Sequence, residues 1–442
     1  MKRTLVHAAL AACLLGAVSG AALMPVLAAD APDERPKVSR AVSKPLLEAQ
    51  QLEAAKDYAG AMAKIQEAKA IPERTPFDDY AIIQISSNIA ISQQDYPAVL
   101  AAAEAMAASP AEPASDKPGT RHNLVLLEYR VKNYAKSVQY GEDLQALGKL
   151  DKDTATAMVQ SYYFINNYPK AQALSQEWVN AAIAANQPPD ESMLNILFSS
   201  QAKNNDQTAA AKTLELLAKY YSSPADWDRL IQVAMGTAGI TNVEGLDLYR
   251  LRWAAAAMSK GEDYSLMATI AMQLGYPGEA RYVLQQGIQM GRLSSVGGVG
   301  PAFQQARTQA IADEKLIPAF AVEAGKSPTG EKEEKLAETY YGYGRFADSE
   351  AAVRLALSKD GLRDPGQAKI LLGMDLVAQG KYQDAVNILH EVTTGSEARM
   401  QTVHLWSIYA EHKVQEMLAA AKPVAGPATA PAAAPPATPP AQ

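Results

Sequence analysis

The chain of 442 residues has little cysteine, histidine and phenylalanine: one, five and six residues. The single cysteine, Cys13, lies in an N-terminal apolar segment, so the rest of the chain can form no disulfide, thiol nucleophile or cysteine-ligated metal site. Basic clusters are also missing, and the net charge of −7 argues against nucleic acid or an anionic membrane as the main partner. The apolar content of 48% includes much alanine, which favours closely packed helices over a β-sandwich.

The first 28 residues have the features of an export signal. Lys2 and Arg3 precede a long apolar stretch, which ends in small residues at Ala28. We therefore predict a signal peptide cleaved near Ala28 and a periplasmic location. The alternative is that the Leu-Ala-Ala-Cys sequence ending at Cys13 is a lipoprotein signal, and only lipidation of Cys13 would attach the protein to a membrane.

A short pattern recurs along the chain: a polar turn, then an aromatic residue, then small residues. The recurring aromatic residues are Tyr58, Tyr96, Tyr134, Tyr168, Tyr276, Phe346 and Tyr382. Their separations are multiples of about 36 residues, the period of a helical-hairpin repeat. We expect each aromatic side chain to fill the gap between the two helices of a hairpin. The common phase predicts about ten hairpins, three of which lack the aromatic residue.

The repeating residues resemble the tetratricopeptide repeat (TPR) family, whose unit is a helix-turn-helix of about 34 residues. Before Tyr382, Leu372 and Gly373 match the first helix, Gly380 matches the turn, and Ala385 matches the second helix. The resemblance implies an all-α, TPR-like solenoid, wound as a right-handed superhelix of about ten helix pairs. It also implies a scaffold that binds proteins and is not an enzyme.

The expected organisation starts with the signal peptide and ends with a tail rich in alanine and proline. In order, the segments are a signal peptide (1–28), a linker (29–42), N-terminal TPR-like repeats (43–221), degenerate helical repeats (222–325), C-terminal TPR-like repeats (326–395), a capping helix (396–421) and a disordered tail (422–442). The composition of the tail cannot supply a packed core. It would serve as a spacer or as a polyproline II ligand for an aromatic groove.

Motifs for catalysis and metal binding are weak. Gly-Lys-Ser at 325–327 resembles the end of a phosphate-binding loop, but Phe320 stands where the first glycine is required. His404 and His412 are too far apart on one helix to share a metal without a third ligand. We expect no enzymatic activity, no cofactor and no metal.

Two pairs of neighbouring carboxylates could in principle act as acid and base. They are Asp78 with Asp79 and Glu333 with Glu334. A general acid needs a desolvated pocket to raise its pKa, and these charged sequences favour exposed turns. We therefore expect both pairs to lie on solvated faces.

In TPR proteins, partner segments lie in a concave groove lined by the first helix of each repeat. Carried over by repeat phase, the candidate partner-binding residues are Gln84, Asn88, His122, Tyr129, Gln160, Tyr163 and Tyr341. Alternatively, the tyrosines fill the space between repeats. A basic and aromatic stretch, Leu248–Trp253, is either a partner site or a buried helix whose arginines extend to solvent.

The sequence therefore predicts a non-enzymatic periplasmic scaffold that binds a protein partner of a cell-envelope assembly in its groove. The alternative is a carrier whose groove holds a lipid or glycan chain in envelope transport or polysaccharide export. A glycan site should show stacked aromatic rings, and a lipid site a continuous apolar cavity. A peptide site should show polar side chains spaced for backbone amides.

Overall fold

The computed structural model describes residues 36–294 and 297–421, and these residues form 21 helices and no strand. The predicted all-α, TPR-like solenoid is confirmed. The predicted signal peptide and tail, and the linker up to residue 35, lie outside the described residues. The chain divides into two compact units at Leu124 and Val125, and each is described by itself.

The first unit contains two complete hairpins and the beginning of a third. Its helices are α1 (Arg40–Ala54), α2 (Tyr58–Ala70), α3 (Pro76–Ser92), α4 (Tyr96–Ala108) and the first part of α5 (Lys117–Arg130). Helix α1 therefore begins inside the segment 29–42. Its apolar face packs with α2 and α3 around Val42, Ile65 and Ile85.

The second unit holds the end of α5 and all later helices. They are α6 (Tyr134–Ala146), α7 (Lys152–Phe164), α8 (Tyr168–Ala184), α9 (Glu191–Lys203), α10 (Gln207–Tyr220), α11 (Pro224–Met235), α12 (Asn242–Ala254), α13 (Gly261–Gln273), α14 (Pro277–Gln289), α15 (Val299–Glu314), α16 (Ile317–Lys326), α17 (Glu331–Gly342), α18 (Phe346–Ser358), α19 (Pro365–Ala378), α20 (Tyr382–His390) and α21 (Glu397–Ala421).

The second helix of each hairpin begins at or next to the recurring position. Helices α2, α4, α6, α8, α18 and α20 begin at their aromatic residue, and α14 begins one residue after Tyr276. In the three hairpins that lack the aromatic residue, the second helix begins at Gln207, Asn242 and Ile317. The ten hairpins of the prediction are thus present. Tyr276 is buried, Tyr96 is 39% exposed, and the other aromatic residues are half-buried.

Turn chemistry explains why the pattern starts a helix at this position. Lys56 has a left-handed backbone (φ 62°), and this conformation ends α1 with the Asp57 N–H donating to the Leu52 carbonyl (2.9 Å). Asp57 then caps α2, because its carboxylate accepts the Gly60 N–H (2.9 Å). A single three-residue turn therefore closes one helix and opens the next.

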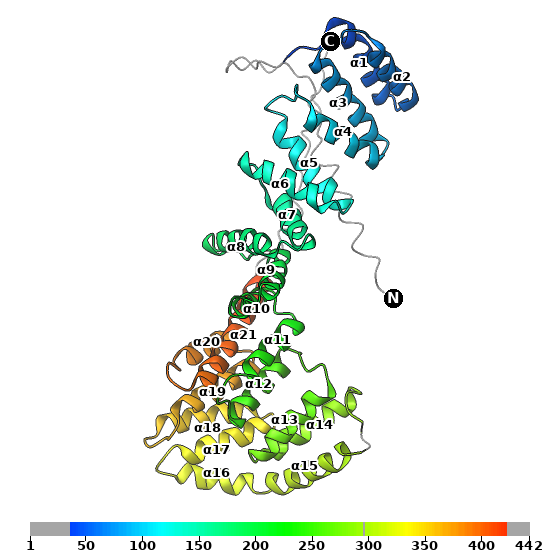
Figure 1. The fold of residues 1–442 in the computed structure, drawn as a ribbon. Coiled ribbons are helices and arrows are strands. Elements are labelled where there is room, and N and C mark those ends of the chain that lie inside the picture. Colours follow the sequence, from blue (N-terminus) through cyan, green and yellow to red (C-terminus); the bar gives the residue numbers. More distant parts are fainter. Residues whose placement is uncertain (1–35, 295–296, 422–442) are drawn as a thin grey trace, which may run out of the picture. The chain divides into compact units, whose positions relative to one another are not determined.

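Helix α21 does more than cover the last hairpin. It packs on α20 and α19, and it also returns to α10, α11 and α12 (Figure 1). The Trp406 indole N–H donates to the Asp247 carbonyl (3.1 Å), and the Tyr409 hydroxyl donates to the Ala254 carbonyl (2.7 Å). Since α14 also contacts α17, helices α10–α21 form a closed arrangement, called the ring below.

The prediction of exposed carboxylate pairs is wrong for one member of each pair, since Asp78 is 0% and Glu333 1% exposed. Asp78 accepts hydrogen bonds from the backbone N–H groups of Thr75 (2.9 Å) and Ser39 (2.7 Å). Burial alone would raise the pKa of Asp78, but these bonds outweigh it and lower the pKa. Glu333 pairs with Lys359. Both acids hold local structure together.

Candidate functional site

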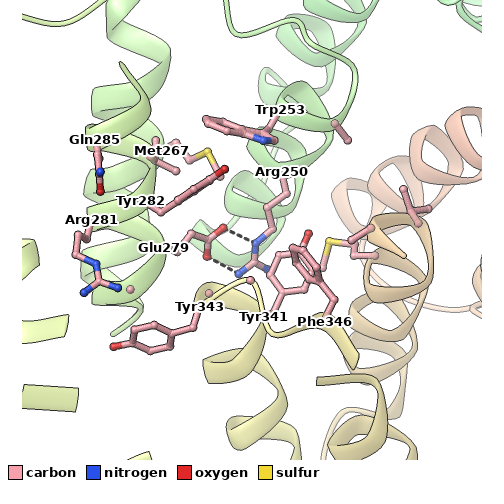
Figure 2. Close-up of a pocket in the computed structure, with 18 of the residues that line it drawn as sticks. Arg250, Trp253, Met267, Glu279, Arg281, Tyr282, Gln285, Tyr341, Tyr343 and Phe346 are labelled. Atoms are coloured by element: carbon pink, nitrogen blue, oxygen red, sulfur yellow. Dashed lines mark hydrogen bonds and ion pairs between the residues drawn. The ribbon is translucent and has the colours of Figure 1, made fainter. Parts of the chain in front are cut away.

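A cavity of about 1090 Å³ lies within the ring, lined by residues of α12–α15 and α17–α21 (Figure 2). Pockets for small ligands occupy roughly 300–1000 Å³, so this one has room for such a ligand or a short peptide segment. The closure by α21 creates part of its wall, because Trp406 and Tyr409 are lining residues. The cavity therefore depends on contacts between distant parts of the chain.

One wall of the cavity is polar. Helix α14 contributes Arg281, Gln285 and Gln289, which recur every fourth residue and so share one helix face. Tyr282 and Trp253 stand beside this stripe, with ring centroids 5.6 Å apart. This wall offers amide and guanidinium groups next to two aromatic surfaces.

The opposite wall is apolar. It consists of aromatic and aliphatic side chains from α18–α21: Phe346, Met374, Val377, Ala378, Tyr382, Trp406 and Tyr409. The polar atoms of Trp406 and Tyr409 already bond to backbone carbonyls of α12. These two side chains therefore present carbon to the cavity.

A buried ion cluster lies between the two walls (Figure 2). The Arg250 guanidinium donates to both Glu279 carboxylate oxygens (2.8 and 2.7 Å) and to Asp247 (2.9 Å). It also lies over the Tyr341 ring, 4.5 Å from the centroid. Burial raises the pKa of Asp247 to about 6 although Arg250 opposes this. The cluster joins α12 to α14 and fixes the floor of the cavity.

The expectation that arginines of 248–253 extend to solvent is wrong. Arg250 is 6% and Arg252 5% exposed, because each guanidinium has buried carboxylate partners. The Arg252 partner is Asp263, at 2.7 Å. Breaking such a pair would leave an uncompensated buried charge, which costs about 3–5 kcal/mol. The stretch is therefore a structural part of the ring, and it also contributes Arg250 and Trp253 to the cavity.

Further buried polar groups support the cavity from behind. Gln367 of α19 donates to the second Asp247 oxygen (2.9 Å), which joins α19 to α12. Ser349 of α18 donates to Asp375 (2.7 Å). Burial raises the pKa of Asp375 to about 8, although the bond from Ser349 acts in the opposite direction. The folded chain therefore keeps the proton of Asp375 to a higher pH than the unfolded chain does.

A close approach between α14 and the turn after α17 shapes part of the cavity wall. A Cβ atom on Gly278 would lie 2.6 Å from the Tyr343 ring, so only glycine allows this contact. The Tyr343 hydroxyl donates to Asp313 (2.9 Å), which fixes the ring against α15. Tyr343 thus stands in a defined position at the wall.

The structure does not bring the seven predicted partner-binding residues together. Of these, only Tyr341 lines the cavity. Tyr129 donates to Gln160, and Tyr163 packs edge-on against Tyr168 with centroids 5.3 Å apart, all in α5–α8. The remaining three residues, Gln84, Asn88 and His122, lie on α3 and α5 in the first unit.

The residues that sequence reasoning missed are on α14. Arg281, Gln285 and Gln289 have the spacing of one helix face. Helix α14 is the second helix of its hairpin, however, and the TPR resemblance assigns partner binding to the first helix of each repeat. A polar stripe at every fourth residue, next to Tyr282, was the available signal.

Within the described part of the chain, no group of three or more His, Cys, Asp or Glu side chains is arranged to hold a metal ion. No helix within residues 36–294 and 297–421 has the length and hydropathy needed to span a membrane.

No protein-family model matches the sequence, and no curated protein matches it. Solved structures that are similar include a chain of Naa15/Naa10 bound to HypK-THB, at 14% identity, 82% coverage of this chain, 58% of that chain and a TM-score of 0.39. A tetratricopeptide repeat protein from Parabacteroides merdae is 9% identical, and the match covers 76% of this chain and 100% of that chain with a TM-score of 0.30. The pentatricopeptide repeat protein PPR10 from maize is 13% identical, and the match covers 88% of this chain and 64% of that chain with a TM-score of 0.30. This chain thus spans less than two thirds of the first and third of these chains, and the similarities say nothing about its ligand.

Proposed function

We propose that the protein is a non-catalytic scaffold that binds a segment of a partner protein in the ring cavity. The polar stripe of Arg281, Gln285 and Gln289 facing an apolar wall carries this proposal. Carboxamide side chains both donate and accept hydrogen bonds, as the peptide group does, and the apolar wall offers a place for side chains of the segment.

The lining residues favour binding over catalysis. They include no Ser, Thr, Cys, His or Lys, so the described lining has no pair of nucleophile and base of the usual kind. Glu279 is the one lining carboxylate, and both of its oxygens accept from Arg250. A carboxylate held in this way is a poor general base.

A glycan chain is the second candidate for the same cavity. Trp253 and Tyr282, with centroids 5.6 Å apart, provide aromatic surfaces of the kind that sugar rings stack on. A lipid chain is disfavoured, since the Arg250–Glu279 pair and the α14 stripe interrupt the apolar surface.

The test is site-specific photo-cross-linking in the full-length protein. A benzophenone amino acid at Gln285 is compared with one at Gln232, which lies on α11 outside the lining and is exposed. We expect a discrete protein adduct from position 285 alone, and its loss on Tyr282→Ala. Recovery of only a glycan from position 285 would replace the peptide proposal with the second candidate. Equal adducts at both positions, or none, would refute a cavity site.

We further propose that the scaffold is exported and serves a cell-envelope assembly. The basic residues Lys2 and Arg3, the apolar stretch and Ala28 support export. Fractionation, with the mature N-terminus measured by mass spectrometry, should give a periplasmic chain that begins near Ala29. A lipid-modified N-terminal Cys13 would instead support a membrane-anchored lipoprotein, and an intact Met1 in the cytoplasm would exclude export.

A further inference from the structure

The cavity has more hydrogen-bond donors available than acceptors. No hydrogen bond between the described residues involves the Trp253 indole N–H or the hydroxyls of Tyr282 and Tyr341, and all three side chains line the cavity (Figure 2). The only lining carboxylate, Glu279, has both oxygens bound to Arg250. An indole N–H can only donate, and the tyrosine hydroxyls can donate as well. The cavity is therefore suited to a ligand rich in acceptors.

Two guanidinium groups add positive charge to the donor side. Arg307 of α15 is exposed and makes no ion pair with the described residues. Arg281 of α14 pairs with Glu314 at 2.9 Å, but both side chains are partly exposed, 27% and 45%. A pair between partly exposed groups is weak, so Arg281 can exchange Glu314 for a ligand carboxylate at little cost.

The apolar wall of the cavity places a second requirement on the ligand. The Trp406 N–H and the Tyr409 hydroxyl are already used by backbone carbonyls, and Met374 and Val377 have no charge to offer. Polar groups placed against this wall would lose water without gaining a hydrogen bond, which is unfavourable. The ligand must present an apolar side chain there.

We infer that the partner segment is acidic and carries an apolar side chain beside its acids. Carboxylate side chains bind Arg281 and Arg307, and the apolar side chain packs on the wall formed by Trp406 and Tyr409. This inference rests on the proposed function and specifies the chemistry of the partner. The charge comes from side chains within the segment, so a free chain terminus is not required.

The test uses synthetic peptide pools and the full-length protein. Three fluorescein-labelled nonapeptide pools have a fixed central leucine and flanking residues that are all acidic, all basic or all serine, with both ends blocked. Fluorescence anisotropy should show binding of the acidic pool, weakening as salt rises. Arg307→Ala should lower affinity by up to about fivefold, because the contact of an exposed guanidinium with a carboxylate is weak.

The matched control is Arg292→Ala, because Arg292 is exposed nearby but does not line the cavity. Arg292→Ala should leave the affinity unchanged, and Arg307→Lys should restore part of it. If the serine or basic pool binds as well, and Tyr282→Ala abolishes that binding, the inference fails while the proposed function stands. If no pool binds and position 285 cross-links to no protein, both fail. An equal effect of the two arginine variants would refute a local carboxylate site.

Discussion

The hairpins of α5–α8 and those of the ring are built from the same repeat but held in different ways. Helices α6–α9 contact mainly their neighbours in sequence, as in an open repeat array whose stability is a sum of local terms. In the ring, α21 contacts α10–α12, and hydrogen bonds such as Trp406 to Asp247 join residues 159 positions apart. One long helix therefore converts a repeat array into a closed body with an interior.

The turns of the two regions differ as well. Before α10, the left-handed turn residue is Lys56, Gln94, Lys132, Asn166 or Asn205. Between the two helices of a ring hairpin it is Gly275, Gly344 or Gly380, although Ser222 and Ala256 are left-handed in turns between hairpins. Residues with a Cβ pay roughly 1–2 kcal/mol for this conformation, and asparagine less. The early hairpins therefore contain more local strain.

The largest expected effect comes from breaking the closure. Trp406→Ala removes a fully buried indole and its bond to Asp247, so the ring should lose about 3–5 kcal/mol. Hydrogen exchange should accelerate in α11, α12 and α19–α21 but not in α1–α4. The control is Trp178→Ala on α8, a half-buried tryptophan outside the ring. Uniform loss of protection along both units would contradict a distinct closed ring.

Asp375→Asn tests the buried acid behind the cavity. The folded state holds the proton, since the pKa of Asp375 is raised from 3.8 to about 8, whereas the unfolded chain releases it near 4. The wild type therefore loses stability as pH rises from about 4 to 8, and asparagine does not. Unfolding by urea at several pH values should show the variant more stable by up to about 4 kcal/mol at pH 7. A gain that does not change with pH would show that Asp375 is not protonated in the fold.

Exchanging turn residues tests the strain difference. Lys132→Gly should stabilise its hairpin by about 1 kcal/mol, because glycine adopts a positive φ freely. Gly344→Ala should destabilise by a similar amount, and no atom lies within 4 Å of a Cβ there, so the cost is purely conformational. Thermal unfolding should shift in opposite directions for the two variants. Shifts of the same sign would show that backbone strain does not distinguish the regions.

The smallest effect concerns the contact between α21 and α10. The His404 ring lies 3.1 Å from Glu215, whose hydrogen bond raises the pKa of His404 above its usual value of 6.5. Protonated His404 therefore stabilises the closure below pH 6.5, and this contribution is lost as pH rises through the folded pKa. Both groups are partly exposed, so the effect should be about 0.5 kcal/mol or less.

His404→Gln should remove the pH dependence of this contact, as measured by urea unfolding between pH 5 and pH 8. His122→Gln, in the first unit, is the control. An unchanged pH profile in the His404 variant would mean that the contact contributes nothing to closure.

The sequence alone predicted the repeat because its signal is local. The turn needs a left-handed residue, a cap and a helix start within three positions, so Lys56-Asp57-Tyr58 specifies its own structure. The same signal could have predicted the hairpin whose second helix begins at Gln207. Asn205 is the left-handed residue there, and Asp206 caps the helix. Phase alone correctly counted the hairpins that lack an aromatic residue.

The cavity could not be predicted in this way. Its walls combine Trp253, Arg281 and Trp406, which are far apart in the sequence, and their meeting depends on the accumulated curvature of many hairpins. Small changes in each helix crossing decide whether α21 reaches α12, and no local pattern encodes them. The burial of Arg250 also depends on its ion pair with Glu279, which lies on a different helix.

The position of α21 has a consequence for the order in which the chain folds. Early hairpins can form before the later ones, because their contacts are sequential. The cavity lacks part of its wall until Glu397–Ala421 has packed on α12, so a partly folded chain has no complete cavity. A chain that ends before Glu397 would leave the apolar interior of the ring uncovered. Proteases that act on exposed apolar segments would therefore degrade it.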